Sequence, residues 1–106
     1  MDDEPERAGS TGPGNLLPRA YVTLSMADHD YKGHRGEAMK QIAAAAKVLR
    51  INLHGDNVVR EKQAVSDEQL RIARSLLQEA RPQLRGGALK HVDKAINQIN
   101  IALSVK

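Results

Sequence analysis

The sequence predicts an all-α protein, an antiparallel four-helix bundle built from two repeated helical hairpins. Four stretches of the 106-residue chain carry apolar residues at three- and four-residue steps, the period of a helix with one apolar face. No stretch alternates apolar and polar residues, so no sheet is expected. Residues 27–33 and 37–49 align with residues 80–86 and 87–99. Two hairpins with one apolar face each can bury those faces only against each other.

The composition is that of one globular domain. The chain has 41% hydrophobic residues and no cysteine, which excludes disulfides, thiol nucleophiles and cysteine-ligated zinc. No apolar run is long enough for a membrane span. Residues 1–14 hold four acids, one base, three glycines and two prolines. We therefore expect a disordered acidic tail over 1–14 and the four-helix bundle over 15–106.

The first hairpin is expected between residues 16 and 50. Asn15 is a suitable N-cap, and apolar residues continue on one face as far as Tyr31, which predicts a helix over 16–32. Gly33 and Gly36 interrupt the pattern, and the next helix is expected over 36–50. It contains the alanine run 43–46, whose small side chains let two backbones approach closely. The alternative is that these alanines are only helix-forming surface.

The second hairpin follows a connector over residues 51–65, where the helical period is lost. Ser66 and Gln69 have the spacing of a capping box, so a third helix is expected to open there. Pro82 is expected to end or kink this helix, and a fourth helix runs from Gly86-Gly87 to the C-terminus. We expect the four helices to run alternately up and down.

The densest polar cluster lies between the first two helices. Tyr31 ends the apolar stripe of its helix, so its ring is expected to pack inward while its hydroxyl reaches a polar partner. Asp30, His34 and Arg35 would complete a structural corner of ion pairs and helix caps.

A metal site is the alternative for this cluster. If the two hairpin loops lie at the same end of the bundle, then His29, His34 and His91 come together, and imidazoles with nearby carboxylates suit zinc, nickel or copper. The chain contains neither HxxxH nor HExxH. We therefore expect no metal and no cofactor.

A second candidate consists of Arg85 and His91, separated by five residues. This spacing in a short helical protein is similar to the catalytic pattern of HEPN-type ribonucleases. The resemblance implies that Arg85 would hold the scissile phosphate and His91 would act as general acid or base. Gly86 stands where that family usually has a polar residue. The alternative interpretation is structural: Arg85 is a charged residue at a helix end, and His91 is a surface histidine.

Two surfaces are candidates for binding a partner. One is a row of arginines along the third helix, and the other is a pair of β-branched residues off the main stripe of the last helix. They are Arg71, Arg74, Arg81 and Arg85, and Ile101 and Val105. Acidic residues interrupt the arginine row and its helix has no aromatic side chain to stack bases, so nucleic acid is not the expected partner. The connector residues Leu53, Val58 and Val59 could instead cover the β-branched pair.

Two segments carry a resemblance to a family. ADHDYKGHR at 27–35 and KHVDKAINQINIALS at 90–104 resemble small bacterial helical-hairpin proteins of unknown function. The resemblance would cover about residues 20–105. It implies the hairpin fold and, because many members carry an export signal ahead of such a segment, export with a signal peptide outside this sequence. It implies no activity.

These observations favour a non-enzymatic interaction module that binds a protein partner or itself through the arginine row or the last helix. The ribonuclease and a weak His/Asp metal-binding protein are the alternatives. The sequence leaves the compartment open.

Overall fold

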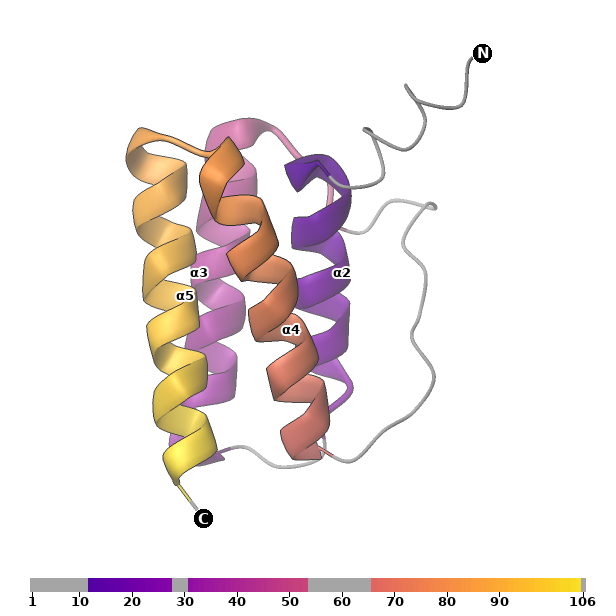
Figure 1. Ribbon diagram of the computed structural model, residues 1–106, viewed down its shortest axis with the longest axis vertical. Coiled ribbons are helices and arrows are strands. Elements are labelled where there is room, and N and C mark those ends of the chain that lie inside the picture. Colours follow the sequence, from indigo (N-terminus) through magenta and orange to yellow (C-terminus); the bar gives the residue numbers. More distant parts are fainter. Residues whose placement is uncertain (1–11, 28–30, 54–65, 106) are drawn as a thin grey trace.

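The computed structural model describes residues 12–27, 31–53 and 66–105, which form a bundle of helices (Figure 1). Its helices are α2 (Pro13–Ser25), α3 (His34–Leu49), α4 (Ser66–Ala80) and α5 (Gly86–Ser104). A 3₁₀ turn, η1 (Tyr31–Gly33), precedes α3, and another, η2 (Arg81–Gln83), follows α4. The described residues contain no strand. The predicted all-α four-helix fold is confirmed.

Helices that contact each other in the bundle run antiparallel. The most extensive contacts join α3 to α5 and α2 to α4, whereas the contacts within each hairpin, α2 with α3 and α4 with α5, are smaller. The bundle therefore has the circular order α2, α3, α5, α4. We call the end at which α2 and α5 begin the upper end, and the end at which α3 and α4 begin the lower end (Figure 1).

The expected alternation of helix direction along the chain is wrong. The first residues of α3 and α4 lie together at the lower end, where the Tyr31 hydroxyl donates a hydrogen bond to Asp67. The chain between Leu53 and Ser66 therefore joins opposite ends of the bundle. Twelve extended residues reach roughly 40 Å, more than the roughly 24 Å length of a 16-residue helix, so the connector is long enough.

Fully buried alanines line the close helix pairs. They recur at seven-residue steps, which keeps them on one side of a helix that packs along its whole length against an antiparallel partner. They are Ala38 and Ala45 on α3, Ala88, Ala95 and Ala102 on α5, Ala73 and Ala80 on α4, and Ala20 on α2. Because a methyl side chain is small, two backbones can approach each other closely where alanines meet. The helix pairs that pack most tightly are therefore α3 with α5 and α2 with α4.

Larger apolar side chains fill the space between the two pairs. The fully buried ones are Leu16, Leu17, Leu24, Ile42, Leu70, Leu77, Val92 and Ile99. In the alanine run 43–46, Ala45 and Ala46 are buried and the other two are half-buried, so the run supplies both core and surface. Leu49, the expected end of the stripe on α3, is 37% exposed because it lies in the last turn of its helix.

The first hairpin departs from its expected boundaries where the backbone turns left-handed. Tyr31, Lys32 and Gly33 have φ values of +54°, +56° and +86°, so the first helix cannot continue to residue 32, and α2 ends at Ser25. A left-handed conformation costs a non-glycine residue about 1 kcal/mol or more. At its start, α2 extends two residues into the expected tail, because Pro13 suits the first helical position and Gly12 is the N-cap.

The second hairpin begins with α4 at Ser66. Gln69, the expected partner in a capping box, is only 2% exposed, and its Nε2 atom has no hydrogen-bond partner among the described residues. As expected, the α-helix stops before Pro82, which lies in η2.

We expect Ala45→Leu to lower the free energy of unfolding by about 1–3 kcal/mol, because the larger side chain would force α3 and α5 apart. Ala44→Leu is the matched control, since Ala44 is half-buried one position away. Chemical denaturation of both variants checks this. Equal destabilisation by the two substitutions would show that the tight α3–α5 contact does not depend on alanine.

Candidate functional site

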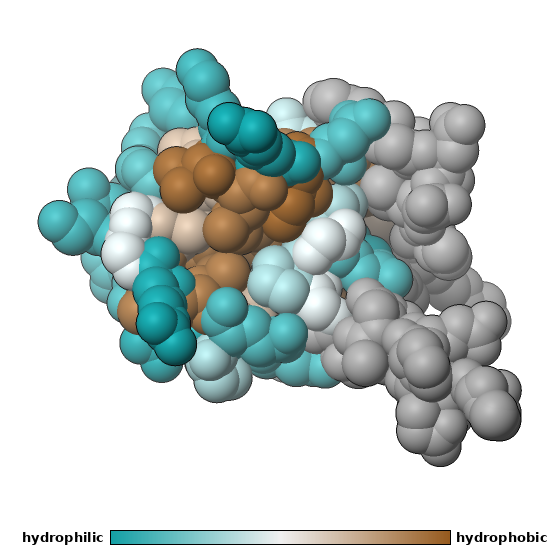
Figure 2. Space-filling view, turned by 90° about the horizontal axis from the view of Figure 1, so that it is seen from above, coloured by the Kyte–Doolittle hydropathy of each residue, from teal (hydrophilic) through white to brown (hydrophobic). Residues whose placement is uncertain are grey.

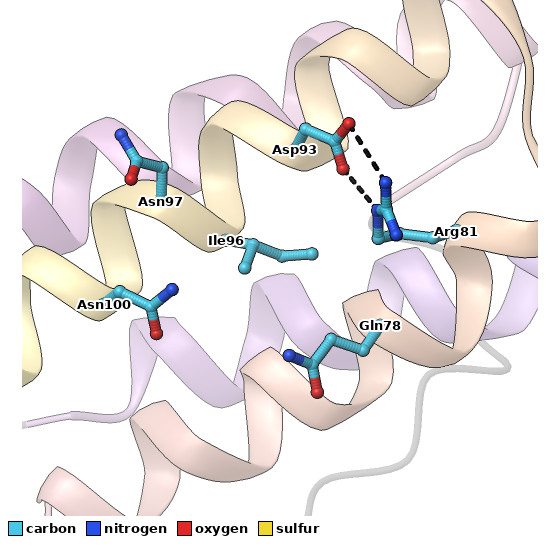
Figure 3. A pocket seen from close by; sticks show the side chains of 6 residues that line it. All are labelled: Gln78, Arg81, Asp93, Ile96, Asn97 and Asn100. Carbon is cyan, nitrogen blue, oxygen red and sulfur yellow. Dashed lines mark hydrogen bonds and ion pairs between the residues drawn. The ribbon is translucent and has the colours of Figure 1, made fainter.

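A groove runs between α4 and α5, the side of the bundle on which the helices of the second hairpin face each other (Figure 3). Its volume is about 470 Å³. The residues that line it are Gln78, Arg81, Asp93, Ile96, Asn97 and Asn100. The four contributions from α5 follow helical spacing and share one face. Five of the six lining side chains are polar, and Ile96 lies among them as the apolar contact.

An ion pair closes the upper part of the groove. Arg81 Nε donates to Asp93 Oδ1, and a second guanidinium nitrogen lies 3.4 Å from Oδ2, so the two groups meet at two points (Figure 3). This bonding raises the pKa of the Arg81 guanidinium. The side chains are 47% and 45% exposed, so the pair fixes geometry more than it stabilises the fold.

The arginines predicted as one binding row do not share one environment. Arg74 donates a 2.7 Å hydrogen bond to Asn100 Oδ1, and Arg81 pairs with Asp93, so both reach across to α5. Arg71 on α4 and Arg85 before α5 are exposed. Two of the four arginines therefore join α4 to α5 along the groove.

The histidines considered as metal ligands lie far from each other. His34 Nδ1 is 2.6 Å from Gln98 Oε1 near the lower end, and His91 Nδ1 is 2.8 Å from Gln41 Oε1 toward the upper end. The two hairpin turns are at opposite ends of the bundle, so the expected convergence does not occur. His29 lies outside the described residues. Within the described ranges, no three histidine or acidic side chains are placed to hold a metal ion.

The structural corner forms around Tyr31. Its side chain is 7% exposed, and its hydroxyl donates a 2.7 Å hydrogen bond to Asp67 Oδ1. Burial, and then the bond to Asp67, raises the pKa of Tyr31 to about 12. Arg35 donates to the Leu24 carbonyl across 3.1 Å and so satisfies an oxygen in the last turn of α2.

His34 does not take the capping role expected of it at this corner. His34 is the first residue of α3 and pairs with Gln98, while Gly33 occupies the N-cap, so His34 does not cap the helix. Asp30 lies outside the described residues.

Arg85 and His91 lie in different surroundings. Arg85 is the exposed N-cap of α5, and His91 contacts Gln41 of α3. The resemblance to ribonucleases therefore rests on the spacing in the sequence.

Ile101 and Val105 are half-buried near the lower end of α5. Leu53 follows α3 at the upper end, so it does not cover them. Val58 and Val59 lie outside the described residues.

Sequence reasoning missed the amides that line the groove and the residues that pair with Tyr31 and the histidines. Asp93, Asn97 and Asn100 repeat at four and three residues, which is a second, polar face of α5. That spacing could have indicated the groove. No local sequence pattern indicates the roles of Asp67, Gln41 and Gln98, because their partners are far away in the sequence.

Comparisons with known proteins add no family. A scan of protein-family models found no match to the chain, and searches of curated proteins and of solved structures found no significant match. Among the described residues, no helix is both long and apolar enough to cross a membrane.

We expect Tyr31→Phe to lower the free energy of unfolding by about 1 kcal/mol, because Asp67 loses its hydroxyl donor, and Tyr31→Ala to lower it by about 3 kcal/mol. The pKa of Tyr31 is raised above 10, so wild-type stability is complete below pH 10 and falls as the pH rises toward 12. Denaturation at increasing pH measures this, and Tyr31→Phe should lack that part of the decline. An identical decline in both proteins would contradict the role of this hydroxyl.

We expect His34→Ala to cost about 1 kcal/mol, the usual effect of losing one hydrogen bond. Added zinc or copper should leave the melting temperature of the wild type unchanged. A rise of several degrees that a chelator reverses and His34→Ala abolishes would establish the metal alternative instead.

Proposed function

We propose that this protein is a non-enzymatic interaction module that binds a polypeptide segment of a protein partner in the groove between α4 and α5. The observation that carries this proposal is the contrast between the two sides of α5. The side facing α3 is sealed by alanine, whereas the side facing α4 leaves an open groove of about 470 Å³ with side chains held in place by cross-helix bonds.

The chemistry of the groove suits a peptide backbone. The amides of Gln78 and Asn97 each offer a donor and an acceptor, as the backbone of a polypeptide does, and Asn100 offers its NH₂ group while its oxygen accepts from Arg74. Arg81 and Asp93 neutralise each other, so the groove favours neither strongly acidic nor strongly basic ligands. Ile96 offers one apolar contact for a partner side chain.

The ribonuclease alternative has less support in the geometry. The role would require Arg85 and His91 to act on one phosphate, and His91 is bonded to Gln41 on the α3 side of the helix. The arginine row has two members occupied by α5, which leaves fewer guanidinium groups for phosphates.

We also propose that the two hairpins are repeats of one unit, as the sequence alignment predicts. In that alignment Gln41 corresponds to His91, and these two side chains bond to each other across α3 and α5. A contact between equivalent positions is what an approximate two-fold axis produces. This contact supports the repeat.

Site-specific photo-crosslinking tests the proposed groove. We expect a benzoylphenylalanine at Asn97 to crosslink a distinct protein in extract from the source organism, and the same group at Lys40 on the exposed surface of α3 to crosslink none. With the purified partner, Asn97→Ala combined with Asn100→Ala should weaken binding by about tenfold, because two groove amides are lost.

Three results would contradict the proposal. If the group at Lys40 crosslinked with the same yield as the group at Asn97, the captured protein would have no preference for the groove. Crosslinks only to a second copy of this chain would indicate self-association. RNA cleavage by the purified protein that His91→Ala abolishes would establish the ribonuclease.

A further inference from the structure

The upper end of the bundle exposes an apolar patch. Val48 is 56% exposed and Leu49 is 37% exposed, and they are the large hydrophobic residues exposed among those the structure describes. Both belong to the last turn of α3, which lies at this end. Figure 2 looks onto the end and shows hydrophobic side chains gathered there with hydrophilic ones around them.

Cations border this patch. Lys47 and Arg50 flank Val48 and Leu49 in the chain, and Arg85 precedes α5 at the same end; all three are exposed. The acidic residues nearest this end of α4 and α5 are Glu79 and Asp93, and Asp93 is already paired with Arg81. Among the residues that the structure describes, the end of α3 is therefore apolar at its centre and positive at its edge.

The backbone beneath the patch is fixed. The Ile51 N–H donates to the Ala46 carbonyl across 2.8 Å, and the Arg50 N–H donates to Lys47, so the end of α3 is closed by a tight C-terminal turn. Arg50 has φ +61°, a position at which glycine is usual because it avoids the cost of left-handed backbone. An arginine at this position costs stability relative to glycine, and it adds a positive charge next to Val48 and Leu49 in the chain.

Charge and composition decide which occupant fits. A second copy would bring the same positive edge against itself, and like charges oppose that contact. A membrane contact of this size would use aromatic anchors, and the two aromatic residues of the chain are Tyr21 within α2 and Tyr31 at the lower end. An acidic polypeptide with apolar side chains complements both the centre and the edge.

We propose that the end of α3, formed by Lys47, Val48, Leu49 and Arg50, together with Arg85 at the same end of the bundle, is a docking surface for an acidic protein segment that carries apolar side chains. The segment places apolar groups on Val48 and Leu49 and carboxylates near the three cations. This surface shares no residue with the groove between α4 and α5, so it is a second contact and does not depend on the function proposed for that groove.

Fluorescence anisotropy with defined peptides tests the proposal. The probe is a fluorescein-labelled synthetic peptide of repeated Leu-Glu-Glu-Leu units, with control peptides in which Gln replaces Glu or Ser replaces Leu. We expect the full-length protein to bind only the first peptide, and more weakly at high salt. Lys47→Glu with Arg85→Glu should weaken binding by about tenfold, and Lys40→Glu with Lys94→Glu, an equal change of charge at exposed sites elsewhere, should weaken it much less.

Two further variants separate a binding role from a structural one. Val48→Ser should weaken binding without lowering the melting temperature, because the Val48 side chain is 56% exposed. Arg50→Gly should raise the melting temperature, since glycine relieves the left-handed backbone, yet weaken peptide binding.

The following outcomes would overturn the proposal. The Lys40 and Lys94 substitutions could weaken binding as much as those at the patch, which would mean that net charge alone attracts the peptide. Phosphatidylserine vesicles could bind in a manner dependent on Val48 while the peptide does not, which would identify a membrane contact. A dimer detected by analytical ultracentrifugation and lost in Val48→Ser would identify self-association.

Discussion

The close antiparallel contact between α3 and α5 is the constraint on which the rest of the structure depends. Alanines at seven-residue steps on both helices let the backbones come together along their length. A similar contact joins α2 to α4, with Ala73 and Ala80 on α4 and Ala20 on α2, so the protein consists of two tight pairs, each taking one helix from each hairpin. Large aliphatic side chains then fill the core between the pairs, because neither pair has room for them inside.

Polar side chains give this contact its register. The bond of His34 to Gln98 and that of His91 to Gln41 are seven residues apart on both helices, the same interval as the alanines. A shift of the helices would break both bonds and would also bring larger residues into the narrow contact. At the lower end, Tyr31 and Arg35 tie the start of α3 to α4 and α2, which helps to hold Tyr31 and Lys32 in left-handed backbone.

Both proposed surfaces follow from these two pairs. Because α5 is drawn to α3, its other face stands away from α4, and polar side chains bridge the groove that remains. Because the last turn of α3 lies at the upper end of the bundle, Val48 and Leu49 stay exposed there. The groove and the end of α3 are thus the surfaces that remain exposed once the alanine-lined helix pairs have formed.

The sequence by itself determined that four helices form, since apolar periodicity, proline and glycine act within a few residues of the chain, although the first helix ends at Ser25 and not at residue 32. It also singled out Tyr31 as an inward-facing side chain, and it identified Arg74 and Arg81 without their partners. Only the tertiary structure decided which helices pair, because both possible circular orders bury the same apolar faces and the long connector permits either. That choice put the two hairpin turns at opposite ends and separated His34 from His91. The bonds of Arg81 to Asp93 and of Arg74 to Asn100 lie within the second hairpin and depend on how α4 and α5 lie side by side. Contacts of this kind depend on how whole helices pack, and no local pattern in the sequence contains them.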